Sequence, residues 1–171
     1  MSLERFIAHS KQGLTRTNRY NVTIYPPPAV PVGGGFTERL MLYSDTATLP
    51  GISMNTMPQR ITGEPREFVY ERNLDPCNIT FYVDAGMDNK RFFDAWQAAI
   101  IDPVTRTSGY YENYVTTIQI DIIPVYDSGP TYTMYLLEAY PKSVGSVQLS
   151  AQSRDVMTLN VGFVYKGYAT T

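Results

Sequence analysis

The feature that most constrains this chain is an alternation of apolar and polar residues with a period of two. It recurs in the segments 20–25, 77–83, 117–123 and 157–165. Successive side chains of a β-strand point to opposite faces, so each segment predicts a strand with one buried face. The apolar members are the candidate core residues Ile79, Phe81, Ile118, Ile120, Ile122, Leu159, Val161 and Phe163.

Three further segments are weaker strand candidates: 40–48, 60–70 and 131–139, of which the last two are rich in aromatic, β-branched or long apolar residues. This composition favours strands, although the alternation is weaker. The turn-forming residues 127–130 separate 116–126 from 131–139. So short a connection predicts an antiparallel hairpin, because a parallel crossover needs a much longer link.

One segment, 88–101, has helical periodicity. Phe92, Trp96 and Ile100 recur at intervals of four and form one apolar stripe, which predicts a helix packed on a sheet. Asp88 is the expected N-cap, and Pro103 stops the helix. A short N-terminal helix is expected over 3–9. The predicted fold class is mainly β, an antiparallel β-sandwich or barrel with one flanking helix, and Phe92 and Trp96 join the candidate core.

Two irregular segments interrupt this pattern. Segment 26–36 combines prolines with three glycines and is expected to be an exposed loop. Segment 49–58 mixes turn formers with apolar residues, and an exposed apolar loop usually has a binding partner. The candidate contact residues of this second loop are Leu49, Pro50, Gly51, Ile52, Met54 and Met57.

Composition narrows the classes of function. The 171 residues have the length of one domain, 1–171, and 18% of them are charged, against about 25% in an average globular protein. The net charge is -2 without a basic block, which disfavours tight binding of a nucleic-acid backbone. The N-terminal residues lack the apolar core of a signal peptide, and no segment approaches 18 apolar residues, so we expect synthesis in a cytoplasm without membrane anchoring.

The sequence contains few residues that could form a catalytic or metal site. One histidine, His9, and one cysteine, Cys77, offer two of the three or four ligands that a zinc site needs. A nucleophilic site would depend on His9 as its base. Paired carboxylates remain open, because 16 acidic residues always allow some pairing in space. We therefore expect no enzyme, cofactor or metal site, and a protein that works by associating with other protein surfaces.

The order of several motifs along the chain resembles that of a known protein family. Arg19-Tyr20-Asn21-Val22 is followed by Thr46-Ala47-Thr48-Leu49-Pro50-Gly51-Ile52, by the strand 78–84, by Arg91-Phe92-Phe93-Asp94-Ala95-Trp96 and by Tyr140-Pro141-Lys142-Ser143-Val144-Gly145. Over about 3–166 the chain resembles the tail tube protein of T4-like contractile-tailed bacteriophages, in the phage tail tube and Hcp-like superfamily.

This resemblance implies hexameric rings that stack into a tube through which DNA is ejected. Four strands of each subunit would line the channel, matching 40–48, 60–70, 116–123 and 131–139. The candidate channel-facing residues are then Thr117, Gln119 and Asp121, and 49–58 is the candidate inter-ring loop. The implied partners are further copies of the chain and the tail sheath, baseplate and tail terminator proteins. The implied location is the tail of the virion, assembled in the bacterial host's cytoplasm.

Two alternatives stay open. One is a baseplate tube initiator or a tube subunit of an injection or secretion device, which would share the fold. The other is a monomeric β-sandwich that binds a ligand in a pocket of convergent polar groups. The segment 26–36 is longer than the corresponding turn of the family and is expected to decorate the outside or to contact the sheath.

Overall fold

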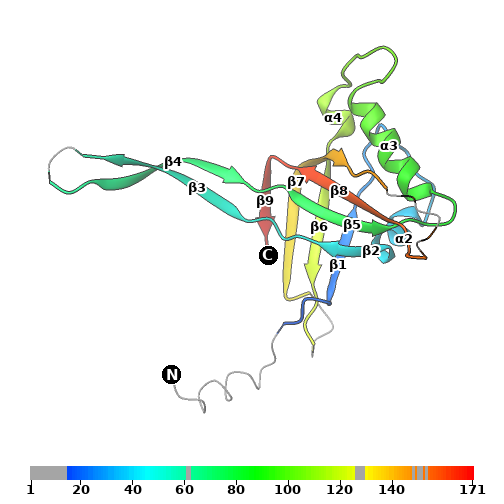
Figure 1. The fold of residues 1–171 in the computed structure, drawn as a ribbon, viewed down its shortest axis with the longest axis horizontal. Helices are drawn as coiled ribbons and strands as arrows, with labels where there is room; N and C mark the ends of the chain where they lie inside the picture. The colour runs from blue at the N-terminus through cyan, green and yellow to red at the C-terminus, as the bar shows by residue number, and fades with distance from the viewer. Residues whose placement is uncertain (1–14, 61–62, 126–129, 148, 150–151, 153) are drawn as a thin grey trace.

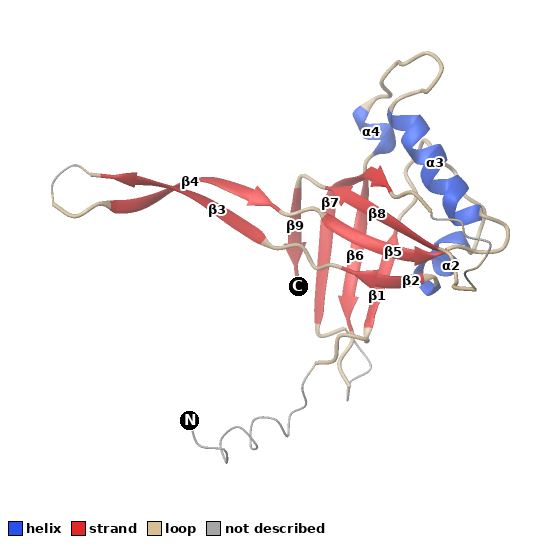
Figure 2. Ribbon diagram, viewed as in Figure 1, coloured by secondary structure: helices blue, strands red, loops and turns tan. Residues whose placement is uncertain are grey.

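Antiparallel strands form most of the chain in the computed structural model, which describes residues 15–60, 63–125, 130–147, 149, 152 and 154–171. A first sheet contains β1 (Tyr20–Ile24), β6 (Thr116–Ile122), the first part of β7 (Tyr132–Val144) and β9 (Gly167–Thr170), in that order. We call it the inner sheet. The prediction of a mainly antiparallel β-fold is confirmed (Figures 1 and 2).

The second part of β7 leaves the inner sheet and joins a second one, the outer sheet. It pairs there with β8 (Thr158–Val164), which pairs with β5 (Cys77–Tyr82), which pairs with β2 (Ser44–Ala47). The strand changes sheets at Glu138, whose φ of 52° lies in the left-handed region. Lys166 Nζ contacts Glu138 Oε1 at 2.7 Å at this corner. One bent strand therefore holds the two sheets together.

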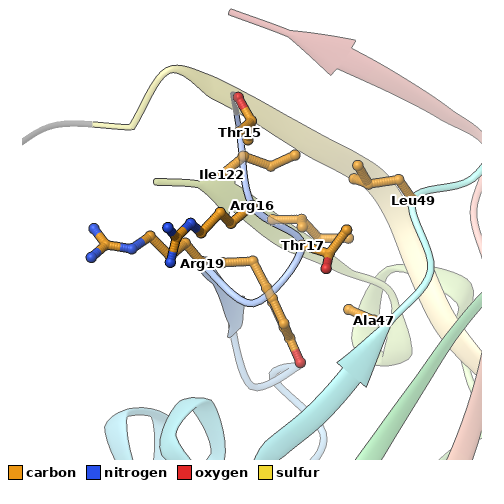
Figure 3. Close-up of a pocket in the computed structure, with 9 residues that line it drawn as sticks. Thr15, Arg16, Thr17, Arg19, Ala47, Leu49 and Ile122 are labelled. Atoms are coloured by element: carbon orange, nitrogen blue, oxygen red, sulfur yellow. The ribbon is translucent and has the colours of Figure 1, made fainter. Parts of the chain in front are cut away.

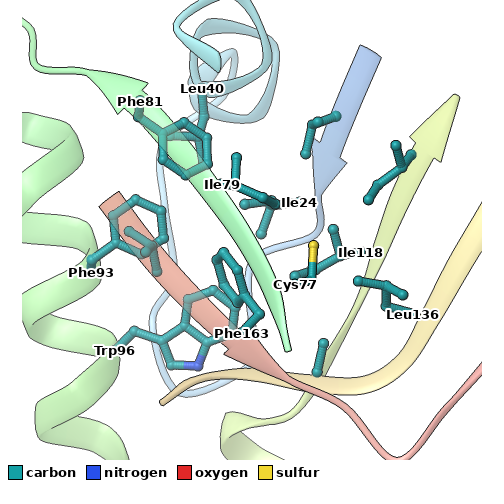
Figure 4. Packing of buried hydrophobic residues seen from close by; sticks show 14 of the residues in the cluster. Ile24, Leu40, Cys77, Ile79, Phe81, Phe93, Trp96, Ile118, Leu136 and Phe163 are labelled. Carbon is teal, nitrogen blue, oxygen red and sulfur yellow. The ribbon is translucent and has the colours of Figure 1, made fainter. Parts of the chain in front are cut away.

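The predicted helix is α3 (Asp88–Ile100), and it packs on the outer sheet. The rings of Phe93 and Trp96 lie 6.2 and 6.1 Å from that of Phe163 in β8 (Figure 4). The N-cap is Met87, with a φ of 59°, so the assignment of Asp88 as N-cap is wrong by one residue. The carboxylate that accepts a backbone N–H at this end belongs to Asp84, whose Oδ1 lies 3.2 Å from the N atom of Asn89.

A second helix, α2 (Phe36–Leu42), contradicts part of the expected strand 40–48, because β2 begins only at Ser44. Phe36 and Leu40 are buried at a spacing of four, which a helix satisfies and a strand does not. The segment 26–36 is also less exposed than predicted. Pro27 is buried, and Val30 and Val32 pack against the core. A short helix, α4 (Tyr111–Tyr114), follows α3.

The remaining strands, β3 (Ile52–Gln59) and β4 (Arg66–Leu74), form a two-stranded hairpin that extends away from the rest of the protein (Figures 1 and 2). We call it the arm. The expected loop 49–58 is therefore mostly a strand, and the expected strand 60–70 begins only at Arg66. The inner sheet accordingly differs from the set of strands that the resemblance implied. β6 and β7 are joined by β1 and β9, not by 40–48 and 60–70.

The core lies between the sheets and under α3. Nine of the ten candidate core side chains are buried, and Ile122 is the exception. Ile122 is half-buried because it lies at the end of β6, where it lines a pocket. The expected helix over 3–9 lies outside the described residues. None of the described helices is long and apolar enough to span a membrane.

Candidate assembly surfaces

The face of the inner sheet that points away from the core carries the three candidate channel residues. The side chains of two of them, Gln119 and Asp121, belong to a hydrogen-bonded row. Tyr25 Oη donates to Gln119 Oε1 at 3.1 Å, and Gln119 Nε2 donates to Asp121 Oδ2 at 2.9 Å. Thr133 Oγ1 also donates to Asp121, at 2.7 Å. These four polar side chains thus bind one another, which restrains them. Thr117 lies on the same face, next to Tyr25.

The register extends this polar face across all four strands. Thr23, Gln119, Tyr135 and Ala169 are successive partners in one row. A second row contains Asn21, Asp121, Thr133 and Thr171. No lysine or arginine occurs in these two rows, so the two rows offer a polyanion no cation to bind.

On each side the inner sheet ends in a strand whose outer edge is unpaired. Among the described strands, β1 pairs with β6 alone and β9 pairs with β7 alone. Thr133 and Thr171 exchange both backbone hydrogen bonds, at 3.1 and 3.0 Å. In the antiparallel pattern the N–H of the preceding residue, Thr170, must then point away from β7. Such an edge is a template for another strand.

The arm is exposed on both faces. An isolated two-stranded hairpin is at best marginally stable in water, so this one is expected to have a partner. Its apolar side chains are uncovered: Met54, Met57, Phe68, Val69 and Tyr70 are each at least half exposed. The sequence singled out the two methionines but missed the three residues of β4. The sequence does contain a sign of this exposed surface, because three consecutive apolar residues of a strand must place apolar side chains on both faces.

The base of the arm is fixed to the protein. The guanidinium of Arg72 lies over the ring of Tyr168 in β9, 5.6 Å from the ring centre. Tyr165 Oη donates to the carbonyl oxygen of Asp75 at 2.8 Å, and burial raises the pKa of Tyr165 to about 12. Gly51 and Leu74 lie here too: the N–H of Asp75 donates to Gly51, and Leu74 packs against the core. The arm base and the β9 edge therefore form one unit.

A pocket of about 230 Å³ lies at the other edge, where the sandwich opens between β1 and β2 (Figure 3). Its apolar walls come from Ala47, Leu49, Ile120 and Ile122, and its rim carries Arg16 and Arg19. The six candidate residues of 49–58 are thus divided. Leu49 lines this pocket, Pro50 is buried, and Gly51, Ile52, Met54 and Met57 belong to the arm and its base.

Hydrogen bonds close the sandwich beside this pocket. Tyr20 Oη in β1 donates to the carbonyl oxygen of Asp45 in β2, and Tyr82 Oη donates to Asp45 Oδ1 at 2.7 Å. Burial, and then the charge of Asp45, raises the pKa of Tyr20. The hydrogen bond to Asp45 raises the pKa of Tyr82. These contacts hold the pocket walls at a fixed separation. Among the described residues no group of three or more histidine, cysteine, aspartate or glutamate side chains is placed to hold a metal ion.

Solved structures share this arrangement of strands. A chain of the anti-feeding prophage (AFP) baseplate, 6-fold symmetrised, matches with a TM-score of 0.67 and 13% identity, covering 92% of this chain and 95% of that chain. A chain of an extracellular contractile injection system, the PVC sheath-tube complex in extended state, matches with a TM-score of 0.68 and 14% identity, covering 100% and 98%. A chain of the AFP tube terminating cap matches with a TM-score of 0.67 and 15% identity, covering 92% and 91%. At these identities the likeness concerns the fold.

Sequence comparison supplies the family. Among curated proteins no significant match was found. The family model described as phage tail tube protein matches residues 15–171, which includes both sheets, all three helices and the arm. Together with the mainly β fold, this match means that the chain belongs to the phage tail tube protein family.

Proposed function

We propose that six copies of this chain close into a ring by pairing β9 of each copy with β1 of the next. The observation that carries the proposal is that the inner sheet has an unpaired edge on each side. Joining these edges around a ring would leave no free edge in the inner sheets, which removes a site of uncontrolled aggregation. The number six is taken from the six-fold symmetry stated for the AFP baseplate, a chain of which has this fold.

Strand direction supports this edge pairing. Every neighbouring pair in the inner sheet is antiparallel, and the order β1, β6, β7, β9 contains four strands. With an even number of alternating strands, β9 runs opposite to β1. A second copy can therefore continue the antiparallel pattern without reversing its orientation. The same contact repeated by rotation gives a closed ring.

The polar face of the inner sheet then lines the channel. Thr117, Gln119 and Asp121 face the lumen in this arrangement, while α3, which packs on the outer sheet, lies on the outside. The lumen wall would be polar, internally hydrogen-bonded and without cations in its two rows. DNA is a polyanion whose tight binding depends on lysine and arginine, so it would slide along such a wall. We infer a conduit for DNA ejection, not an enzyme.

Stacked rings would form the inner tube of a contractile tail. The similar solved chains come from assemblies described as a baseplate, a sheath-tube complex and a tube terminating cap. By the same logic this chain would contact sheath, baseplate and terminator proteins in the tail of the virion, after assembly in the host cytoplasm. The loop 26–36 would then lie on the outside, available to the sheath.

A proline at the β9 edge tests the proposal. Thr170 is exposed and its N–H points outward, so Thr170→Pro removes a donor that the single subunit does not use, and proline is tolerated on edge strands. Thr170→Ala is the matched control, because it keeps the N–H. Negative-stain imaging should show rings or hollow tubes for the wild type and Thr170→Ala, and single particles for Thr170→Pro. Rings formed equally by Thr170→Pro would contradict the edge pairing.

The same images separate the alternatives. Long tubes support a tube subunit, whereas a single ring that does not extend supports a baseplate initiator. Strictly monomeric wild-type particles at every concentration would favour a monomeric binding module. The pocket at the β1 edge speaks against that module, because its volume of about 230 Å³ is below the usual 300–1,000 Å³ of ligand sites.

A further inference from the structure

The side chain of Ile122 is more exposed than those of the other candidate core residues. It continues the apolar row of Ile118 and Ile120, which are buried, but nothing in the described part of the chain covers it fully. With Tyr20, Ala47 and Leu49 it surrounds the pocket at the β1 edge. An apolar wall left open at the edge where a second copy is proposed to join suggests that the second copy supplies the missing cover.

The arm carries a surface of the matching kind at the opposite edge. Partners in a strand ladder share a face, so Met54 lies on the face of its partner Arg72. Two residues further along β3, Thr56 returns to that face together with its partner Val69. Met54 and Val69 are 52% and 60% exposed. This face therefore carries two uncovered apolar side chains, beginning next to Arg72.

The orientation of this face follows from Arg72. Its guanidinium lies over Tyr168, whose ladder partner is Leu136, and the partner of Leu136 is Ile118. Tyr168 therefore lies on the core side of the inner sheet, and so does the arm face above it. The arm continues past β9 on the side away from β1, across the direction of the inner strands (Figure 1). In a ring it would pass over the core side of the next copy's β1 and β6.

The reach of the arm agrees with the position of the pocket. Val69 lies two ladder positions beyond Arg72, because the register shifts between them, or about 7 Å at the usual rise of a strand. The next copy's β1 and β6 lie one and two strand spacings beyond β9, about 5 and 10 Å, so Val69 falls between them. The pocket lies further along the strands than Tyr168, because Ile122 is four residues past Ile118, whose row contains Tyr168. Neighbouring strands of a closed barrel are staggered, and the contact requires that this stagger displaces the next copy so that the end of its β6 lies under the arm.

We propose that Met54 and Val69 of one copy occupy the pocket formed by Tyr20, Leu49 and Ile122 of the next copy. This contact rests on the proposed ring and specifies how neighbouring copies recognise each other beyond their strand edges. The same contact would also involve the arginines at the rim of the pocket. Arg16 and Arg19 take part in none of the ion pairs between described residues, and Glu67 of the arm lies on the same face as Val69, placed to approach them.

Cysteine cross-linking tests the contact. The double variant Val69→Cys, Ile122→Cys should form covalent ladders between copies when assembled protein is oxidised and run on a non-reducing gel. The matched control is Phe68→Cys, Ile122→Cys, because Phe68 is the adjacent residue on the opposite face of the arm and is 50% exposed. The control should show no more cross-linking than the wild type, whose one thiol, Cys77, is buried.

A second pair, Val69→Cys with Leu49→Cys, avoids any change to β6 and should also form ladders. Rings that form normally without cross-linking through Val69, or with equal cross-linking through Phe68, would overturn this contact and leave the ring itself intact. Monomers that show neither rings nor ladders would contradict both the contact and the proposed function.

Discussion

Arg72 of the arm lies over the ring of Tyr168 in β9, with 5.6 Å between the guanidinium carbon and the ring centre. This pair joins the two features that point toward the same side of the subunit, the free edge of the inner sheet and the arm. An arm fixed in direction loses less conformational entropy when it docks than a flexible one. In the proposed ring the pair would therefore bear on assembly more than on the stability of the single subunit.

We expect Arg72→Ala to weaken assembly while changing the folded subunit little. An exposed cation–π contact is worth about 0.5–1 kcal/mol. If each subunit loses about 1 kcal/mol on joining, the protein concentration at which rings or tubes appear should rise about fivefold. Light scattering against concentration measures this, with thermal unfolding as the check on folding. Arg66→Ala, at the far end of the arm, is the control, and an equal effect of both variants would contradict the role given to Arg72.

Two isoleucines of β6 should respond differently to a charge. Ile120 is 1% exposed, so Ile120→Asp buries an unpaired carboxylate and should lower the free energy of unfolding by at least about 4 kcal/mol. Ile122 is half-buried in an open pocket, so Ile122→Asp should cost less than about 2 kcal/mol and should still block ring formation. Urea unfolding and imaging test the pair. Equal losses of stability would show that Ile122 is as fully buried in the single subunit as Ile120.

Lysines on the polar face should convert a non-binding channel into one that retains DNA. The double variant Thr117→Lys, Gln119→Lys adds two positive charges per copy to that face. The charge-matched control Ala95→Lys, Ala98→Lys places them on the exposed side of α3. Tubes of the first variant assembled with short duplex DNA should protect it from nuclease, with binding that weakens steeply as salt rises. Protection by the control, or none by the first variant, would place the polar face outside the lumen.

Cys77 should be unreactive in the folded protein. Its thiol is fully buried and donates to the carbonyl oxygen of Thr48 at 3.2 Å, and burial raises its pKa to about 12. At pH 8 a soluble alkylating reagent should modify it only after unfolding. A raised pKa in the folded state gives stability that is present below the ordinary thiol pKa and is lost as the pH rises toward about 12. Cys77→Ala should reduce this loss of stability at alkaline pH. Rapid alkylation of the native protein at pH 8 would contradict the burial of the Cys77 thiol.

Local sequence patterns predicted much of the fold. Alternation located β1, β5, β6 and β8, and the Phe92 to Trp96 spacing located α3, because these elements bury one face and keep the other polar. Alternation did not reveal the elements that lack one buried and one exposed face. β3 is exposed on both faces and contains Pro58, so it has no alternation to detect. The helix α2 has just two buried residues behind three glycines, and its apolar content was mistaken for a strand.

The assembly surfaces were harder to predict than the elements. The position of Thr117, Gln119 and Asp121 on the polar face follows from alternation, since that face is the complement of the core face, whereas their channel-facing role came from the resemblance and stays a prediction. The neighbours of β6 depend on pairing between segments far apart in sequence, so the roles of β1 and β9 could not be read from local pattern. Ile122 looked like any other core residue. Its incomplete burial depends on the end of the sandwich, a property of the whole fold.

A cryo-EM reconstruction of the assembled wild-type protein tests the central claim most directly. We predict that the backbone of Thr170 in β9 lies within hydrogen-bonding distance of β1 of the adjacent copy, and that Thr117, Gln119 and Asp121 face a central channel. A reconstruction in which the β1 and β9 edges stay apart, or in which α3 lines the channel, would contradict the account.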